Sequence, residues 1–550
     1  MFTYGPWGFL DYPLGVSTFN LVAAAVFGIL TITATWLVFD GVLKRVLPEP
    51  WAAAATTLLV ALASQVVTIS SVLLVAAALA AMEFLGTPVA GRRWWLPASV
   101  SGCAAFLLQV KFSEGVILTG IAIACAVLAP AARLRRSAEA AGSYLLVTGC
   151  AWLAAGQSLA ELPTWLRGAT EVAQGYTEAM SLEGKPNVVG YLLIAAVIGI
   201  SAAYLVAMAR SRPDRRAVAG VVITVCLMLF LGFREGTGRH GPGHQHYFFL
   251  FALPAAAWFL PSARSVALRS AALVGTVLLS TVHWLPTEPQ VALGQWGTML
   301  QTVLDGQFRG TELARARTRA QRVYRLSPEL KAAVEGVPVA VDPTEVTLPW
   351  AYGLEWNPAP AFQSYFAYTA RLDRRNAQAI TDGPADQAIL RDATRAIDGR
   401  NILWDPPRYL LAELCGYRVA ASDQHWMLLR KSSDRCSEAV TVSTERVEAG
   451  RPLTVPSAGP DQILVVSFTE RAGSPAVRIG RVLDKSFHPL TVTAGTTRFR
   501  VPRGLADGPL LVRMPAAAGW PAAFGGATAY PSLTFSEAGT ARFSVISLTG

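Results

Sequence analysis

The chain has 550 residues, of which 52% are hydrophobic and only 15% charged, and its mean hydropathy is +0.38. These values are unusual for a soluble protein of this length. The hydrophobic excess lies almost wholly between residues 15 and 285, in apolar stretches separated by short arginine-rich loops. The formal net charge of +10 belongs mainly to those loops. We therefore interpret the charge as a sign of membrane topology and expect no nucleic-acid partner.

The first fifteen residues contain no basic residue and no apolar core, which excludes a signal peptide. Asp11 is the only acid among them. It belongs either to a membrane-interface loop with an aromatic belt or to a site, as a catalytic base or a metal ligand. We expect this segment outside the membrane. We also expect a further helix before Met1, which would give a full-length form of about eleven helices with a cytoplasmic N-terminus.

The apolar stretches predict about ten helices, because a chain segment in a bilayer must satisfy its own backbone hydrogen bonds. Residues 51–86 form either two short helices or one long bent helix. The expected helices lie near residues 16–38, 51–65, 70–86, 97–110, 115–131, 143–157, 188–208, 217–233, 247–262 and 268–285.

The loops between these helices differ in charge, as expected when Lys and Arg are retained on the cytoplasmic side. With two helices in 51–86, one set of alternate loops contains thirteen cations, between Lys44 and Arg269. The other set contains five, namely Lys111, Arg167, Lys185, Arg234 and Arg239. The sequence therefore predicts a multi-pass plasma-membrane protein whose C-terminal half is extracytoplasmic.

Two of the external segments have distinct patterns. Lys111 and Glu114 lie in a tight hairpin, where Lys111 either pairs with Glu114 and reaches the surface or binds an anionic lipid head group. Residues 156–187 carry apolar side chains at helical spacing, which predicts an amphipathic surface helix that is broken at Gly175 and Tyr176. That helix is either a lid on the bundle or a guide for a lipid-linked substrate.

Another external loop, residues 234–247, carries three of the six histidines of the chain, together with two arginines and four glycines. Guanidinium and imidazole groups on a flexible loop suit a phosphate or diphosphate. A metal site on the histidines and a plain solvated loop are the alternatives. The candidate phosphate-binding residues of this loop are Arg234, Arg239, His240, His244 and His246.

The second half of the chain predicts two external domains. Residues 286–437 combine a helical region at 290–335, strands near 339–341, 401–404 and 425–429 and a helix at 408–415, which indicates an α/β domain. Aromatic and amide groups in its middle suit either a saccharide groove or core packing. The candidate sugar-binding residues are Trp350, Tyr352, Trp356, Gln363 and Tyr365.

Residues 438–550 lack helical periodicity and contain short alternating or apolar segments between turn residues, which predicts a β-sandwich. Cys415 and Cys436 are the two cysteines of the external half, and an oxidising exterior would allow them to form a disulfide. The domain boundaries that we expect are 1–285, 286–437 and 438–550.

A polytopic bundle followed by external α/β and β-sandwich domains resembles the GT-C class of membrane glycosyltransferases. The resemblance rests on the segments 2–10, 239–249 and 342–376. It implies transfer of a sugar from a polyprenyl-phosphate donor to an extracytoplasmic glycan or lipid acceptor. It also implies that an acid in the first external loop acts as general base, and Asp11 is the candidate.

Two departures from this class are visible. The usual acid of the first loop could lie before Met1, and Gly241 follows Arg239 and His240 where an acid would strengthen a catalytic or metal role. No cofactor is expected with certainty, and a divalent metal ion is possible. The alternative function is a non-catalytic membrane protein that presents an external carbohydrate-binding or assembly module. A transporter is disfavoured, because no buried run of charges or repeated helix pattern is visible.

Overall fold

The computed structural model describes residues 5–11, 16–45, 47–66, 68–86, 95–128, 133–180, 188–238, 242–259, 289–392, 397–471, 473, 489–526 and 528–549. The chain divides into two compact units. The helical unit comprises Phe2–Ala169 and Glu183–Leu313, and the strand-rich unit comprises Thr170–Leu182 and Ala314–Gly550. Each unit has its own hydrophobic core. The predicted domain boundaries at 285 and 437 stay predictions.

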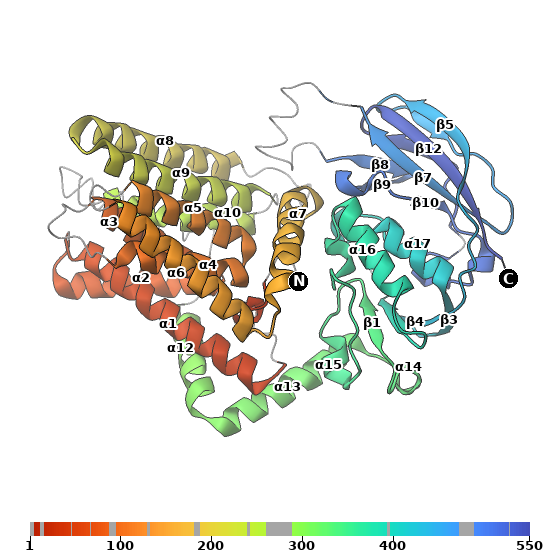
Figure 1. Ribbon diagram of the computed structural model, residues 1–550, viewed down its shortest axis with the longest axis horizontal. Coiled ribbons are helices and arrows are strands. Elements are labelled where there is room, and N and C mark those ends of the chain that lie inside the picture. The colour runs from red at the N-terminus through yellow and green to blue at the C-terminus, as the bar shows by residue number, and fades with distance from the viewer. Residues whose placement is uncertain are drawn as a thin grey trace. The chain divides into compact units, whose positions relative to one another are not determined.

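The helical unit consists of apolar helices that pack side by side (Figure 1). A short 3-10 turn, η1 (Gly8–Leu10), precedes them. The helices are α1 (Thr18–Leu43), α2 (Glu49–Val66), α3 (Ile69–Gly86), α4 (Leu96–Val110), α5 (Phe112–Val127), α6 (Arg133–Ala154), α8 (Val188–Ser211), α9 (Arg215–Thr237), α10 (Pro242–Phe259) and α12 (Pro289–Leu304). A further helix, α7 (Leu162–Met180), begins in this unit and ends in the strand-rich unit.

Among the described residues, four helices are long and apolar enough to cross a membrane, namely α1, α3, α8 and α9. Helix α6 and the segment from η3 (Leu159–Glu161) through α7 make a fifth candidate, bent by 114°, if the pair is counted as one span. The helices α4, α5 and α10 are shorter and apolar. The chain is therefore a multi-pass membrane protein, although the number of its spans is not established by length and composition.

Nine of the ten predicted helices correspond to helices of the structure, and the tenth, at 268–285, lies outside the described residues. Residues 51–86 form two helices, α2 and α3, which confirms the two-helix alternative. Helix α6 begins at Arg133, about ten residues before the predicted start at 143. The apolar window missed this first part because arginines and small residues occupy it.

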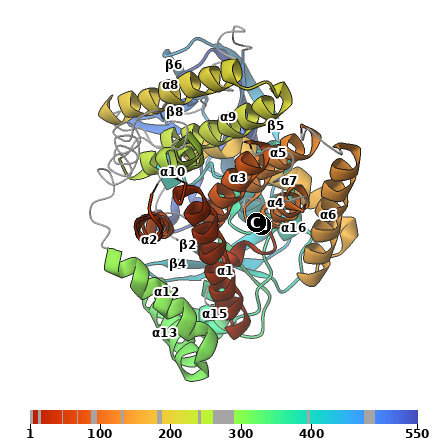
Figure 2. The ribbon, with the colours of Figure 1, turned by 90° about the vertical axis from the view of Figure 1, so that its left-hand side faces the viewer.

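Helix α3 forms the centre of the bundle. Most of its residues are buried, and α1, α4, α5, α9 and α10 pack against it (Figure 2). The sequence of α3 is apolar on every side apart from the two serines in its first turn and Glu83 near its end, as expected for a largely surrounded helix. Because Ser70 and Ser71 are completely buried, their hydroxyl groups need partners inside the protein.

Two loops of the cation-rich set meet at one end of the bundle, beside the last turns of α3. Arg45, after α1, forms an ion pair with Glu83 in α3. Arg212, between α8 and α9, donates a hydrogen bond to the Gly86 carbonyl oxygen at 3.0 Å. The segments of the cation-poor set meet around the α4–α5 turn, as the contacts of Asp11 and Ser71 below show. That the first end faces the cytoplasm remains a prediction from the loop charges.

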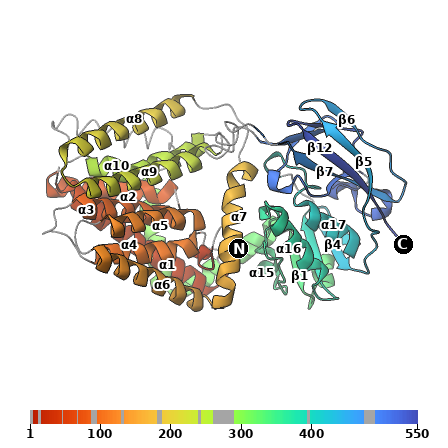
Figure 3. The ribbon, with the colours of Figure 1, turned by 45° about the horizontal axis from the view of Figure 1, so that its top comes forward.

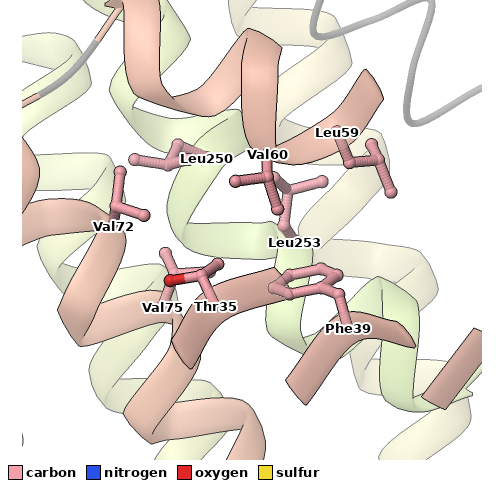
Figure 4. A pocket seen from close by; sticks show the side chains of 8 residues that line it. All are labelled: Thr35, Phe39, Leu59, Val60, Val72, Val75, Leu250 and Leu253. Carbon is pink, nitrogen blue, oxygen red and sulfur yellow. The ribbon is translucent and has the colours of Figure 1, made fainter. Parts of the chain in front are cut away.

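A small apolar pocket lies inside the bundle, between α1, α2, α3 and α10 (Figure 4). Its volume of about 10 Å³ leaves room for no more than one water molecule. Thr35 is the only polar residue in its lining, and its hydroxyl already donates to the Thr31 carbonyl oxygen at 2.7 Å. This pocket therefore offers no room or partners for a polar substrate.

The strand-rich unit begins with a four-stranded sheet and its helices. The elements are α13 (Gly306–Tyr324), whose first residues belong to the helical unit, α14 (Pro328–Ala333), β1 (Val339–Asp342), α15 (Leu348–Tyr352), η5 (Ser364–Phe366), α16 (Ala370–Thr381), β2 (Ala388–Asp392), η6 (Ile397–Gly399), α17 (Pro407–Gly416), β3 (Tyr417–Ser422) and β4 (Trp426–Lys431). The strand order is β1-β2-β4-β3, with β1 and β2 parallel and the other pairs antiparallel.

This arrangement agrees with the predicted α/β pattern, but the expected strand at 401–404 is wrong. Residues 401–404 form a turn, in which the Asn401 side chain accepts a hydrogen bond from the Leu403 N–H at 2.9 Å. Asn favours such turns because its side chain replaces a backbone partner. Two strands of this sheet were not predicted, namely β2 and β3. Strand β2 pairs with β1 and β4 and is buried along its whole length.

The C-terminal part contains two four-stranded antiparallel sheets (Figure 3). Their strand orders are β10-β7-β12-β5 and β6-β11-β8-β9. The rings of Phe468 and Phe535, one from each sheet, stack at 4.4 Å in the shared core. The strands are β5 (Val440–Val447), β6 (Pro452–Thr454), β7 (Gln462–Glu470), β8 (Thr491–Ala494), β9 (Thr497–Arg500), β10 (Leu510–Arg513), β11 (Ser532–Phe535) and β12 (Gly539–Ser547).

Two further features stabilise the strand-rich unit. The buried Arg391 guanidinium in β2 forms ion pairs with Asp342 in β1 and, at 2.7 Å, with Glu413 in α17. Burial raises the pKa of both carboxyl groups, and the guanidinium opposes this shift. A disulfide joins Cys415 to Cys436, which confirms the predicted pairing.

Candidate functional site at the turn between α4 and α5

The N-terminal segment lies against the ends of α4 and α6. The Trp7 backbone N–H donates to the Gln109 carbonyl oxygen at 3.1 Å, and its indole N–H donates to the Ala151 carbonyl oxygen at 2.9 Å. A Cβ atom at Gly5 would come within 2.1 Å of the same Gln109 oxygen. Only glycine permits this close backbone approach, which helps to hold the segment, including Asp11, beside the bundle.

Asp11 follows η1 and lies buried at the first turn of α3. Its Oδ1 accepts a hydrogen bond from the Ser70 N–H at 2.9 Å, an arrangement that helix N-termini favour for a carboxylate. Its Oδ2 is buried and has no hydrogen-bond partner among the described residues. Burial raises the pKa of Asp11 to about 6, although the Lys111 charge lowers it, and the Glu114 charge raises it further.

Lys111 is the single residue between α4 and α5. The turn is so tight that a Cβ atom at Gly115 would come within 2.2 Å of the Leu108 Cα atom. The Lys111 ammonium forms an ion pair with Glu114 Oε1 at 2.6 Å. Glu114 is 1% exposed and Lys111 is 9% exposed, so both charges are removed from solvent. The predicted ion pair is confirmed, but the lysine lies inside the protein and does not reach the surface.

Hydroxyl groups at the start of α3 complete this arrangement. The Ser71 hydroxyl donates to Glu114 Oε1 at 2.6 Å. The Thr68 hydroxyl lies 2.9 Å from the Ser70 hydroxyl oxygen, 3.0 Å from that of Ser71 and 3.4 Å from the Lys111 ammonium. The network thus links the break between α2 and α3 to the turn between α4 and α5. Glu114 Oε2 is buried without a hydrogen-bond partner among the described residues.

The last turn of α9 adds two charges to the same region. Glu235 is close enough to Lys111 and Glu114 for their charges to act on it, and Arg234 is its sequence neighbour. We name the set formed by Asp11, Ser70, Ser71, Lys111, Glu114 and Glu235 the acid–lysine cluster. Buried charges are costly unless they are paired, and such groups at membrane depth are commonly functional.

The structure brings three of the predicted site residues to one end of the bundle, namely Asp11, Lys111 and Arg234. The Asp11 and Lys111 charges interact, and Arg234 adjoins Glu235. His244 lies in the first turn of α10, with its ring stacked on Tyr247 at 6.2 Å. Arg239, His240 and the side chain of His246 lie outside the described residues, so their predicted roles stay predictions.

Sequence reasoning did not assign Glu114 and Glu235 to the site. The sequence identifies Glu114 only as a partner for Lys111, and Glu235 is not among the predicted site residues. Both acids lie in apolar helices, α5 and α9. An acid in such a stretch is itself a signal, because it must face a partner or a cavity.

Helix α7 confirms the predicted amphipathic helix, but the expected break at Gly175 and Tyr176 is wrong. The helix continues to Met180, with Gly175 packed so closely on Tyr368 that a Cβ atom would come within 2.5 Å of the Tyr368 Cβ. The glycine therefore serves close packing inside the strand-rich unit. Near it, Glu171 forms an ion pair with Arg371 at 2.8 Å.

Two of the predicted sugar-binding residues join helices of the strand-rich unit. The Tyr352 hydroxyl donates to the Gln321 carbonyl oxygen at 3.0 Å and accepts from the Leu326 N–H at 3.1 Å. The Trp350 ring lies under the Arg317 guanidinium, 5.2 Å from its centre. These contacts support the packing alternative for both residues.

Two more of these residues also have structural contacts, and a fifth has an exposed ring. The Gln363 amide donates to the Thr344 carbonyl oxygen at 3.1 Å, and Tyr365 is buried beside Arg400. Burial raises the pKa of Tyr365, and the Arg400 charge lowers it. Trp356 packs edge-on against Phe362 at 5.6 Å between ring centres and is still 43% exposed. Of the five, Trp356 is therefore the one best placed for stacking on a sugar.

Comparison with known proteins identifies no family. No family model matches the sequence, and no curated protein matches it. Among solved structures, the chain is similar to the crystal structure of ArnT from Cupriavidus metallidurans bound to undecaprenyl phosphate. The two share 13% identical residues, the match covers 78% of this chain and 88% of that chain, and the TM-score is 0.29. A score of this size carries no argument about the present chain, so its site is interpreted from its own residues.

Proposed function

We propose that the chain is a membrane glycosyltransferase of the GT-C type. It would transfer a sugar from a polyprenyl-phosphate donor to an extracytoplasmic cell-envelope glycan or lipid. The observation that carries the proposal is the acid–lysine cluster at the end of a bundle of apolar helices. A buried base beside cations, within reach of the lipid phase, is what such a transfer requires.

Asp11 is the proposed general base. The acceptor hydroxyl gives its proton to Asp11 Oδ2 while its oxygen attacks the anomeric carbon, and the bond from that carbon to the lipid phosphate breaks. The Oδ1 atom stays bound to the Ser70 N–H, which holds the carboxylate in position. A pKa of about 6 leaves the group ionised near neutral pH and makes it a stronger base than an ordinary aspartate.

Lys111 and Arg234 are the proposed cations for the leaving phosphate. Among the described residues, the site contains these two cations and three carboxylates, those of Asp11, Glu114 and Glu235. An anionic donor therefore needs more positive charge, which the remaining residues of the 234–247 loop can supply. Those residues are Arg239, His240, His244 and His246, and a divalent metal ion is the other source.

The test measures release of polyprenyl phosphate from radiolabelled polyprenyl-phosphate hexose and pentose donors. The purified chain is reconstituted in nanodiscs, and a cell-envelope fraction provides the acceptors. Replacing the base should lower the rate by about 10²- to 10⁴-fold, and replacing a phosphate-binding cation by about 10²-fold. The variants are Asp11→Asn, Lys111→Met, Arg239→Gln and His244→Gln.

A matched control is Asp40→Asn, because Asp40 is another buried acid of the bundle, paired with Lys44 at 2.8 Å in the cation-rich end. Its rate should stay within about twofold of wild type, since it lies outside the acid–lysine cluster. Unchanged release in the Asp11, Arg239 and His244 variants would reject the site. No release from any donor by the wild-type chain would favour the alternative, a non-catalytic protein that presents an external module.

A further inference from the structure

A pocket of about 370 Å³ lies in the α/β part of the strand-rich unit. We name it the α17 pocket, because positions 408, 411, 412 and 415 of that helix line it, at the spacing of a single helix face. The rest of the lining comes from the end of α16, the start of β3 and the segment that ends β4 and follows it (Figure 1). The volume lies in the range of small-molecule sites, roughly 300–1,000 Å³.

The wall of the pocket that follows β4 is fixed against α17. The Ser432 N–H donates to the Gly416 carbonyl oxygen at 2.8 Å, and the Arg435 N–H donates to the Cys415 carbonyl oxygen at 3.1 Å. The disulfide between Cys415 and Cys436 joins the same two segments covalently. The pocket is therefore preformed, which lowers the cost of ordering its wall around a ligand.

The two cations of the lining already have partners within the protein. The Arg408 guanidinium faces two carboxylates, that of Asp373 at 3.6 Å and that of Asp507 at 3.7 Å. The Lys431 ammonium donates to the Thr381 carbonyl oxygen at 2.7 Å and to a second backbone carbonyl oxygen. An anionic ligand would have to compete with these oxygens for both cations, so the pocket favours a neutral ligand.

The polar groups of the lining keep hydrogen-bonding capacity of both kinds. The Lys431 ammonium has three donors, of which two are used in the bonds to backbone carbonyl oxygens. The Asp434 carboxylate is exposed, and one of its oxygens accepts from a backbone N–H at 3.0 Å. The Ser432 hydroxyl donates to a backbone carbonyl oxygen at 3.2 Å, so its oxygen can still accept. Beside these groups, the half-buried Leu411 and Ala412 provide an apolar surface.

We propose that the α17 pocket binds a neutral sugar residue. A sugar ring combines an apolar C–H face with hydroxyl groups that both donate and accept, which matches an apolar surface beside the donor of Lys431 and the acceptor oxygens of Asp434. The Asp434 charge also repels anionic sugars. The inference rests on the proposed function only for the molecule that carries this sugar, which would be the acceptor glycan. Binding in the pocket itself requires no transfer.

The test is saturation-transfer difference NMR on the full chain in nanodiscs. Methyl hexosides and methyl pentosides are the neutral probes, and methyl glucuronoside and glucose 6-phosphate are the anionic probes. We expect saturation transfer to at least one neutral probe. Ala412→Trp should abolish it, because the indole fills the pocket. Asp434→Asn keeps an oxygen for the backbone N–H but loses the charged acceptor, so it should weaken binding about tenfold.

A matched control is Ala421→Trp, which places the same side chain at an exposed position of β3 outside the pocket and should bind as wild type. An unchanged unfolding midpoint shows that a variant is folded. Saturation that survives in folded Ala412→Trp overturns the proposal, as does saturation of anionic probes only or of no probe. If Ala412→Trp does not fold, the decision passes to Asp434→Asn, and wild-type affinity in that variant overturns the proposal.

The outcome is separate from that of the transfer assay. Sugar binding in the pocket of a chain that releases no polyprenyl phosphate from any donor would reject the proposed function and support this inference. Release of polyprenyl phosphate by a chain that saturates none of the probes would do the reverse.

Discussion

Replacing Lys111 by methionine tests whether the buried carboxylates of the acid–lysine cluster depend on one cation. Breaking a buried ion pair by removing one partner commonly costs about 3–5 kcal/mol. This cost has an upper limit, because a carboxylate that has lost its partner can take up a proton and become neutral. For an ordinary carboxyl group, the free energy of taking up that proton is about 4 kcal/mol at pH 7 and about 1 kcal/mol at pH 5. Lys111→Met should therefore lower the free energy of unfolding by about 3–4 kcal/mol at pH 7, and by about 1 kcal/mol at pH 5.

The partner substitution should cost less. In Glu114→Gln, Lys111 keeps the nearby charges of Asp11 and Glu235, and the amide oxygen can still accept from the Ser71 hydroxyl. We expect a loss of about 1 kcal/mol in the free energy of unfolding at pH 7. The difference between the two losses in unfolding free energy measures how strongly Asp11 and Glu235 stabilise the Lys111 charge.

The assay is unfolding by increasing mole fraction of SDS in mixed micelles, followed by tryptophan fluorescence at pH 5 and pH 7. The control is Lys44→Met, which breaks the Lys44–Asp40 pair of the same bundle. The Lys44 side chain is 42% exposed, so this loss should be much smaller. If the Lys111 and Lys44 variants lose equal unfolding free energy at both pH values, the prediction is wrong. Burial would then have no influence on the cost of breaking an ion pair.

Further predictions concern the base, the N-terminal segment and the disulfide. If Asp11 is the base, kcat/KM for transfer should rise with pH through about 6 and level off above 7, and a pH-independent rate would exclude that role. Gly5→Ala should lower transfer at least tenfold without unfolding the bundle, because the new Cβ displaces the segment that holds the base, whereas Gly142→Ala, with open space around it, should have no effect. Replacing Cys415 and Cys436 by serine should lower the unfolding free energy of the strand-rich unit by about 3 kcal/mol, as measured by urea titration, and an unchanged midpoint would contradict it.

The helix pattern could be predicted largely from the sequence. Apolar stretches between Thr18 and Phe259 give helices close to the expected bounds, because a segment without polar partners can satisfy its backbone only within itself. Short segments that alternate or run apolar between turn residues likewise identified β7, β9, β10 and β12. The errors occurred where local signals mislead, at the Asn401 turn and at Gly175, whose role depends on a packing partner distant in sequence.

The candidate site was only partly predictable. Asp11 is the only acid of the first segment, Lys111 is an ionisable group at membrane depth, and Arg234 belongs to the loop suited to a phosphate. Nothing in their spacing shows that they meet. Asp11 is 59 residues from Ser70, and Ser71 is 43 residues from Glu114, yet each pair is hydrogen-bonded. The same holds for the aromatic residues near 350–365, most of which pack against neighbours that no sequence pattern indicates.

The sequence by itself determined that this chain enters a membrane and where most of its apolar helices lie, and it predicts which loops share a side. Those properties follow from the hydrophobicity and charge of single segments. Only the tertiary structure decided that the Lys111–Glu114 pair lies beside Asp11 and Glu235. A buried charge needs a partner, but its identity depends on which helix ends are brought together when the whole bundle packs.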